Sequence, residues 1–316
     1  MQPTKITTLI SEELRDAYIA LWASLTSRYP VGANVFERDW DALIILDTCR
    51  VDALKEVADE YSFLSDIDSI VSVGSTSREW VANTFRTTYT SEIRGTAYVS
   101  ANAFSKRVLK DRNFPADRAP VNWKVADADD FLLVDDAWQY QPEHPYKHML
   151  PEHLTDRAIT VGRELQPDRL IVHYSQPHSP YIAMARREGR ELKPWESNPF
   201  KCLRAGSVER ETVWNAYLEN LRMSLDSVSV LLENLNAERV AISADHGEGF
   251  GRWGTYKHPL GSLQPNVKCV PWATTTARDR GEYEPKFKPR VTGEQGDKDE
   301  FERKETVEHL RDLGYL

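Results

Sequence analysis

A short apolar segment that runs directly into an acid and an imidazole constrains this chain more than any other feature. Val240-Ala241-Ile242 precede Asp245-His246, and a glycine-rich loop continues to His258. Such a run can be covered on both faces in a parallel sheet, and open α/β sheets place their ligands at the carboxyl ends of these strands. The stretch therefore predicts a buried strand that delivers metal-binding side chains to one edge of a sheet.

Length and charge restrict the classes of protein to which the chain can belong. Its 316 residues suffice for one large α/β domain, and its 28% of charged residues is ordinary for a globular protein. The net charge is −9 and no basic patch or stripe stands out, so we expect no nucleic-acid partner.

The cysteines and the amino terminus indicate a reducing compartment. Cys49, Cys202 and Cys269 are too few for a disulfide framework and have no zinc-finger spacing, so we expect buried, reduced thiols. The first residues lack the basic start and long apolar centre of a secretory signal. No apolar run approaches the ~20 residues of a membrane span. We therefore expect a cytoplasmic protein without a membrane span.

Apolar runs alternate with helical periodicities along the chain, which predicts βα units on a mainly parallel sheet. Residues 40–47 form a nearly continuous apolar run that ends on Asp47. Ser11 stands where it would cap the first helix, and Pro271 suggests that the last strand lies at an edge or ends there. Further strands are expected at 96–100, 130–134, 169–174 and 267–273, and helices at 11–26, 51–61, 79–85, 154–165 and 207–235.

One domain, residues 39–279, should contain the sheet and the active site, with less regular parts attached to it. Residues 1–38 are expected to form a helical extension. Dense charge together with two prolines predicts an exposed insertion near 183–208. Residues 280–316 should form a mobile, charged segment and then a short helix that packs on the same domain.

Polar side chains stand at the predicted carboxyl ends of several strands. Asp47 ends the first strand, and Asp245-His246 follow the strand that opens this description. Zinc and manganese accept carboxylate oxygen and imidazole nitrogen together. Asp47, Asp245 and His246 therefore make a three-ligand set that leaves a coordination position open for catalysis.

These motifs, in this order, resemble the alkaline phosphatase superfamily in its sulfatase-like branch. The resemblance implies a three-layer α/β/α sandwich around a mainly parallel sheet, and a divalent metal bound by Asp47, Asp245 and His246. It is carried by an Asp-x-x-Arg-x-Asp turn and four later segments, at residues 46–54, 176–181, 244–248, 270–272 and 310–316.

The resemblance also implies a nucleophile from the loop after the first helix of the domain, which would complete the metal shell. Thr76 is our choice, because it is central in the hydroxyl-rich loop and just precedes a predicted helix start, where free amides favour anionic oxygens. Ser75 and Ser77 remain alternatives. His258 lies 12 residues after His246, a spacing similar to that of phosphoethanolamine transferases in this superfamily.

His178 and His258 match the substrate-side histidines of those transferases. With Thr76 they form the expected catalytic set, in which the two imidazoles neutralise the oxygens of the transferred group. Glu248 is expected to orient His246, and Arg50 to pair with Asp52.

Departures from the family pattern refine the predicted chemistry. Gly74 stands at the position where formylglycine sulfatases carry the modified residue, so phosphate esters are favoured over sulfate esters. Thr48 replaces the second of the paired aspartates of those sulfatases, and Tyr174 replaces an aspartate of the two-zinc phosphatases. Both replacements argue against a complete second metal site.

The resulting hypothesis is a metal-dependent hydrolase or transferase that cleaves a phosphate ester through Thr76. Its partner would be a small-molecule or glycan-linked ester, and its cofactor one divalent metal, zinc or manganese before calcium or magnesium. A sulfate-ester hydrolase of the same fold is the nearest alternative. A catalytically inactive binding or scaffold protein is an alternative of another class, and the oligomeric state is left open.

Overall fold

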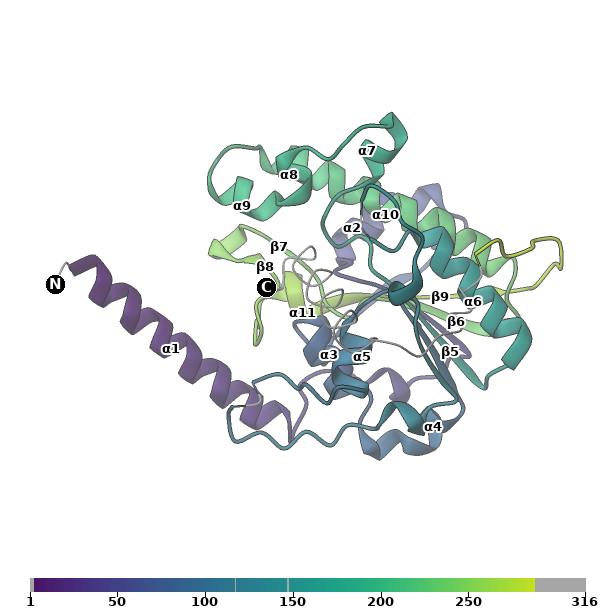
Figure 1. Ribbon diagram of the computed structural model, residues 1–316, viewed down its shortest axis with the longest axis horizontal. Helices are drawn as coiled ribbons and strands as arrows, with labels where there is room; N and C mark the ends of the chain where they lie inside the picture. Colours follow the sequence, from purple (N-terminus) through teal and green to yellow (C-terminus); the bar gives the residue numbers. More distant parts are fainter. Residues whose placement is uncertain (1–2, 117, 147, 288–316) are drawn as a thin grey trace, which may run out of the picture.

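A seven-stranded sheet organises the molecule, which a computed structural model describes for residues 3–287 except 117 and 147, with side chains from residue 13 onward. Its strand order is β2-β9-β6-β1-β5-β3-β4 (Figure 1). The strands are β1 (Ala42–Leu46), β2 (Ile67–Val71), β3 (Thr96–Ser100), β4 (Leu133–Asp136), β5 (Arg169–Tyr174), β6 (Ala237–Ser243) and β9 (Cys269–Ala277). A separate two-stranded ribbon pairs β7 (Gly249–Phe250) with β8 (Tyr256–Lys257).

The core of the sheet is parallel, as predicted. Strands β6, β1, β5, β3 and β4 run in the same direction, and β9 is antiparallel to both of its neighbours. Every residue of β1 is buried, because helices cover this central strand on both faces.

Helices on the two faces of the sheet complete the predicted α/β/α sandwich. One face carries α2 (Val51–Val57), α6 (Pro151–Leu165) and α10 (Arg210–Leu232), which pack on one another, and the other carries α3 (Ser77–Thr84) and α5 (Phe104–Leu109) (Figure 1). Shorter helices are α4 (Thr90–Arg94), α7 (Ala183–Glu188), α8 (Pro194–Ser197), α9 (Pro199–Arg204) and α11 (Pro265–Lys268). The 3-10 turns are η1 (Val35–Glu37), η2 (Ala58–Glu60), η3 (Thr87–Tyr89), η4 (Ala128–Asp130), η5 (Ala137–Tyr140) and η6 (Arg252–Gly254).

The amino-terminal helix α1 (Pro3–Thr26) differs from its prediction at its amino-terminal end. It begins well before Ser11, so Ser11 is not its cap. Hydrogen bonds anchor the carboxyl-terminal half of this helix to the body: Trp22 Nε1 donates to Glu79 Oε1, and the Tyr18 hydroxyl donates to the Gly261 carbonyl. Figure 1 shows this end of α1 next to the rest of the molecule. Four apolar side chains that recur at helical spacing are exposed, namely Leu14, Tyr18, Leu21 and Leu25.

The prediction of an edge position for the strand at 267–273 is wrong. Strand β9 lies between β6 and β2, and Ser69 of β2 pairs with Pro271. Proline lacks a backbone donor, but its carbonyl still accepts a hydrogen bond, here from Ser243 Oγ at 2.7 Å. The true edge strand β2 was not predicted, because its Ile-Asp-Ser-Ile-Val sequence is largely exposed and gives no long apolar run.

The charged insertion folds into α7, α8 and α9, of which α9 contacts β8 next to the active site. Residues 280–287, predicted as the start of a mobile segment, are fastened to α6: the Tyr283 hydroxyl and the Phe287 amide both donate to the Asp156 carboxylate. Residues 288–316, including the predicted last helix, lie outside the described part of the chain. Within the described part, none of the helices combines the length and the apolar character needed to span a bilayer.

Candidate active site

The carboxyl ends of the parallel strands bring chemically active side chains together. Asp47 directly follows β1, Asn102 follows the end of β3, and Asp245 follows the end of β6. Ser77, the first residue of α3, faces them from the helix layer. This is the edge of the sheet at which ligands are expected to bind.

Four buried side chains, of types that can hold a metal, form a compact cluster. Ser77 Oγ lies 3.3 Å from His246 Nε2 and 3.5 Å from Asp47 Oδ2. His246 Nε2 lies 3.3 Å from Asp245 Oδ2 and 3.8 Å from Asp47 Oδ1. All four residues have 0% of their surface exposed. The structure thus brings together the predicted set of Asp47, Asp245 and His246, and adds Ser77.

The unmatched atoms of this cluster fit a divalent cation. Asp47 Oδ1 and Asp245 Oδ2 are buried and make no hydrogen bond with any described residue. His246 donates its Nδ1–H to the Gly247 carbonyl at 2.9 Å, so its Nε2 presents a lone pair to both carboxylates. Buried acceptors that face one another repel unless a positive charge lies among them. Asp47, Asp245 and His246 are therefore the residues that would hold the metal.

Burial shifts the pKa values of Asp47 and His246 so that both side chains favour their neutral forms. Burial, and after it the Asp245 carboxylate, raises the pKa of Asp47 well above its usual value. Burial also lowers the pKa of His246 to about 3, although the Asp245 carboxylate opposes this shift. A neutral His246 is the form that binds a metal.

Of the three candidate hydroxyls, Ser77 is the one that lies in the cluster. Thr76 is the N-cap of α3, and its hydroxyl accepts a hydrogen bond from the Glu79 amide at 3.1 Å. Ser75 Oγ donates to Glu79 Oε2 and accepts from the Gly261 amide. The hydroxyls of Ser75 and Thr76 therefore stabilise the start of α3 and the segment at Gly261.

Replacing Thr76 with alanine should lower the free energy of unfolding by about 1 kcal/mol, because one amide of the first turn of α3 loses its acceptor. Metal affinity should be unchanged. Urea denaturation and a zinc titration measure the two quantities. Loss of zinc binding in Thr76→Ala would return Thr76 to the metal shell.

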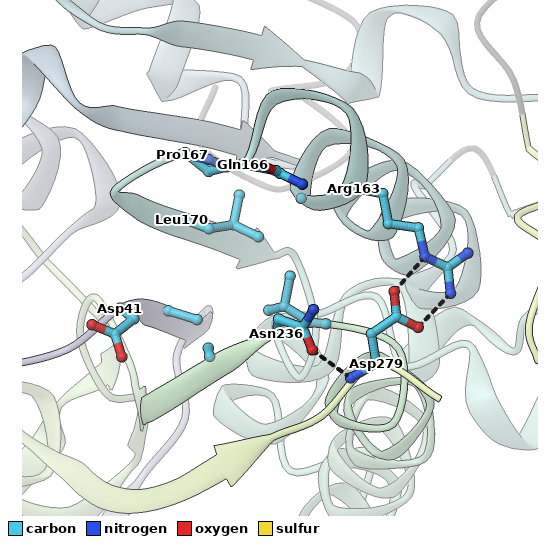
Figure 2. Close-up of a pocket in the computed structure, with 11 residues that line it drawn as sticks. Asp41, Arg163, Gln166, Pro167, Leu170, Asn236 and Asp279 are labelled. Carbon is cyan, nitrogen blue, oxygen red and sulfur yellow. Dashed lines mark hydrogen bonds and ion pairs between the residues drawn. The ribbon is translucent and has the colours of Figure 1, made fainter. Parts of the chain in front are cut away.

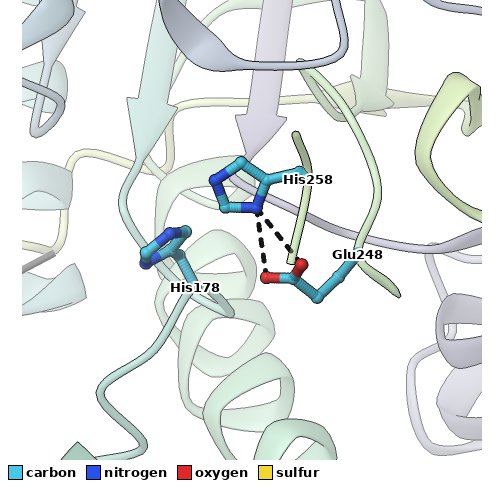
Figure 3. A group of neighbouring side chains, drawn as sticks. All are labelled: His178, Glu248 and His258. Atoms are coloured by element: carbon cyan, nitrogen blue, oxygen red, sulfur yellow. Dashed lines mark hydrogen bonds and ion pairs between the residues drawn. The ribbon is translucent and has the colours of Figure 1, made fainter. Parts of the chain in front are cut away.

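His178, Glu248 and His258 form a second cluster (Figure 3). His258 Nδ1 is 3.2 Å from both Glu248 carboxylate oxygens, and His178 Nδ1 is 2.5 Å from the Ser179 carbonyl. Both histidines therefore keep Nε2 as the acceptor nitrogen. The rings of His246 and His258 are 4.3 Å apart, so the two clusters are contiguous.

This arrangement corrects one expectation and confirms another. Glu248 orients His258 and not His246. Arg50 pairs with Asp52 as predicted, with Nε to Oδ1 at 2.8 Å, and also donates to the Glu248 carbonyl at 3.1 Å. Its guanidinium lies 4.9 Å from the centre of the Trp214 ring. Arg50 thus ties the turn after β1 to the loop that carries Glu248.

Sequence reasoning missed two residues of the site, Asn102 and His173. Asn102 Nδ2 donates to Asp47 Oδ2 at 2.7 Å and to Ser77 Oγ at 3.0 Å, so it fixes the ligand and the hydroxyl relative to each other. The position of Asn102 just after the predicted strand at 96–100 was an available signal. His173 lies inside β5, and nothing in the sequence distinguishes it there from an ordinary buried residue of a strand.

Gly247 permits the close approach that positions His246. A Cβ at this residue would lie 2.1 Å from the Asn266 carbonyl oxygen, which is backbone and cannot swing aside. Gly247→Ala should therefore destabilise the fold by about 1–3 kcal/mol and weaken metal binding. Urea denaturation and zinc titration test this. Gly206→Ala, where a Cβ meets nothing within 4 Å, is the control for zinc affinity, which should stay unchanged, although the φ of +68° at Gly206 should cost this variant some stability.

A separate cavity of about 300 Å³ lies at the opposite, amino-terminal end of the sheet (Figure 2). Its charged groups are already matched: Arg163 makes two 2.8 Å hydrogen bonds to Asp279, and Arg239 Nη2 donates to Asp41 at 2.6 Å. These pairs do not offer the unmatched acceptors that distinguish the candidate metal-binding cluster.

Comparison with solved structures gives matches to two forms of a phosphoethanolamine transferase and to a protein described as a sulfatase. The soluble domain of lipooligosaccharide phosphoethanolamine transferase A from Neisseria meningitidis is 15% identical over 74% of this chain and 75% of its own, with a TM-score of 0.44. The integral membrane form of that transferase is 14% identical over 75% of this chain, with a TM-score of 0.48. A protein described as a sulfatase, from Bacteroides thetaiotaomicron, is 13% identical over 79% of this chain and 66% of its own, with a TM-score of 0.42.

All three structures are less than 25% identical to this chain, so the resemblance to the sulfatase-like branch of the alkaline phosphatase superfamily rests on the sequence motifs. The chain covers 47% of the integral membrane transferase, less than half of its length. No protein-family model and no curated protein matches the sequence. The case for an activity therefore rests on the geometry of the site.

Proposed function

We propose that the protein is a metal-dependent hydrolase or transferase of phosphate esters, with Ser77 in place of Thr76 as the nucleophile. The observation that carries this proposal is the position of Ser77 Oγ, within 3.5 Å of both His246 Nε2 and Asp47 Oδ2 at the start of α3. The neighbouring hydroxyls of Ser75 and Thr76 are engaged with Glu79 or its backbone.

The surroundings of Ser77 suit an anionic phosphoryl group. The first turn of α3 presents backbone amides and the positive end of the helix dipole. A divalent metal held by Asp47, Asp245 and His246 would favour deprotonation of the Ser77 hydroxyl and neutralise charge on the substrate. The open coordination position and the ligand types favour zinc or manganese.

The transfer would occur in two displacements. Ser77 Oγ attacks phosphorus, a new Oγ–P bond forms, and the bond from phosphorus to the leaving alcohol oxygen breaks. Water or an acceptor hydroxyl then attacks the phosphoserine in line and releases Ser77. His178 and His258, 4% and 6% exposed, form the most accessible side of the site and would bind the phosphoryl oxygens or the leaving group.

The residues after Ser77 favour phosphate over sulfate chemistry. A formylglycine sulfatase carries Pro or Ala two residues after the modified residue and Arg four residues after it. Glu79 and Val81 stand at these positions relative to Ser77. The nucleophile available to this chain is therefore an unmodified hydroxyl, which is suited to phosphate esters.

The test is to purify the protein, measure bound metal, and assay aryl phosphate monoesters, aryl phosphate diesters and aryl sulfates. We expect zinc or manganese, and turnover of at least one phosphate ester that chelation abolishes and metal restores. Turnover of sulfate esters alone would support the sulfatase alternative. Absence of both metal and turnover would support an inactive binding or scaffold protein.

A further inference from the structure

A buried histidine that the proposed mechanism does not use lies beside the candidate metal-binding cluster. His173, in β5, has 0% of its surface exposed. Its Nε2 makes no hydrogen bond with the described part of the chain and lies 3.6 Å from Asp245 Oδ2, which makes none with that part either. Two unmatched polar atoms that face each other in a dry interior are costly unless they interact.

The ring of His173 is held so that Nε2 keeps facing Asp245. The Tyr98 hydroxyl lies 2.8 Å from Nδ1, on the other side of the ring. The indole of Trp80, from α3, packs on the imidazole in an edge-to-face arrangement at 5.4 Å between ring centres. Tyr98 and Trp80 are themselves buried, so the ring has no space in which to turn away.

The position of the ring proton on the neighbouring His246 determines which form of His173 Nε2, protonated or not, suits Asp245. Asp245 Oδ2 already faces the lone pair on His246 Nε2 at 3.3 Å, because His246 Nδ1 donates to Gly247. A second lone pair, from His173, would repel the same oxygen, whereas an N–H would stabilise it. The Tyr98 hydroxyl can donate to His173 Nδ1, which leaves the ring proton on Nε2.

We infer that His173 is a positioning residue of the metal site, which donates Nε2–H to Asp245 Oδ2 while the Tyr98 hydroxyl donates to its Nδ1. The inference rests on the proposed metal site. The opposite oxygen, Asp245 Oδ1, accepts from the backbone amides of Thr48 and His246, at 3.3 and 2.9 Å. Asp245 is then held on both oxygens, in the orientation that presents its charge to the metal.

The experiment compares zinc affinity, by competition with a chelating indicator, in the whole protein and three variants. His173→Phe keeps a ring for Trp80 to pack on but removes both nitrogens, and zinc affinity should fall about 10–100-fold. Tyr98→Phe removes one oxygen and should weaken binding in the same direction by a smaller factor. His173→Gln returns a donor group and should recover part of the affinity.

A cobalt spectrum separates a positioning residue from a ligand. If His173 acts through Asp245, the visible absorption of bound Co²⁺ keeps its shape in His173→Phe, although more Co²⁺ is needed to saturate the site. The metal-free variant should unfold at a lower urea concentration than the metal-free wild type, because Asp245 Oδ2 and the Tyr98 hydroxyl each lose a buried partner. A purely structural role would lower that concentration as well, but it would leave the zinc affinity of the folded protein unchanged.

Three outcomes would overturn the inference. Unchanged zinc affinity in His173→Phe, or in Tyr98→Phe if the first variant does not fold, rejects it while the metal site stands. An altered cobalt spectrum in His173→Phe shows a direct ligand instead. A wild-type protein that binds no divalent metal rejects the proposed site and this inference together.

Discussion

Ser77→Ala should lower kcat/KM for the best phosphate ester on the order of 10⁴-fold or more, as removal of a catalytic nucleophile does. The physical reason is that no other hydroxyl of the loop faces the cluster: Thr76 accepts from the Glu79 amide and Ser75 donates to the Glu79 carboxylate. Steady-state kinetics measure the loss. Mass spectrometry of acid-quenched protein should show one added phosphoryl group on the wild type and none on the variant.

Thr76→Ala is the matched control for Ser77→Ala, because it removes a hydroxyl one residue away. It should retain turnover and the phosphoprotein signal. Ser77→Thr should keep partial activity, since it preserves an oxygen at the same position. A dead Thr76→Ala together with an active Ser77→Ala would contradict the assignment and support the prediction made from the sequence.

Asp47→Asn should abolish metal binding and, at neutral pH, make the metal-free protein more stable by about 1–3 kcal/mol. Asp47 Oδ1 is buried without a hydrogen bond, near the His246 lone pair. The asparagine can keep the hydrogen bond from Asn102 with its oxygen and donate to His246 with its amide. The zinc affinity of Asp47→Asn should fall by more than about 100-fold, because loss of a residue that only orients a ligand lowers the affinity about 10–100-fold.

The stability gain from Asp47→Asn should depend on pH. Burial and the Asp245 carboxylate raise the pKa of Asp47 in the folded protein, so the native state binds more protons than the unfolded state near neutral pH. The metal-free wild type therefore loses stability as pH rises above the unfolded value of about 3.9, and the variant does not. Urea denaturation without metal should show the difference at pH 7 and little of it at acid pH.

Asp279→Asn is the control for Asp47→Asn at the other end of the sheet. Its carboxylate is matched by Arg163, so removing the charge should lower stability slightly and leave zinc affinity unchanged. A metal-free Asp47→Asn that is less stable than the wild type, or that still binds zinc tightly, would contradict the account of the cluster.

Much of the fold could be predicted because buried parallel strands have a strong local signal. Strands β3 and β5 occupy the ranges expected from their apolar runs, 96–100 and 169–174. Strand β2 was missed because an edge strand keeps most of its side chains in water and needs no such run. The position of β9 inside the sheet, despite Pro271, depends on the pairing with β2, which a local pattern does not report.

Helix α1 shows what periodicity alone leaves open. Its apolar spacing predicts a helix, and in the structure Leu14 and Leu21 of that helix are 66% and 61% exposed. Periodicity states which side chains share one side of a helix, but not what that side meets. The anchoring contacts come from Trp22 and Tyr18, whose partners lie at Glu79 and Gly261.

The sequence was sufficient to predict the metal ligands, but only the tertiary structure identifies the proposed nucleophile. Asp47, Asp245 and His246 could be predicted from the amino-acid order, since residues that follow buried parallel strands emerge at one edge of the sheet. Thr76 and Ser77 are adjacent, and the choice between them depends on where α3 begins. Thr76 has an extended backbone, with φ −143° and ψ 156°, and turns its hydroxyl to the helix, whereas Ser77 is the first helical residue and faces the sheet. The hydrogen-bond partners of Glu248, Asn102 and His173 likewise come from segments distant in the chain, which only the packed structure brings together.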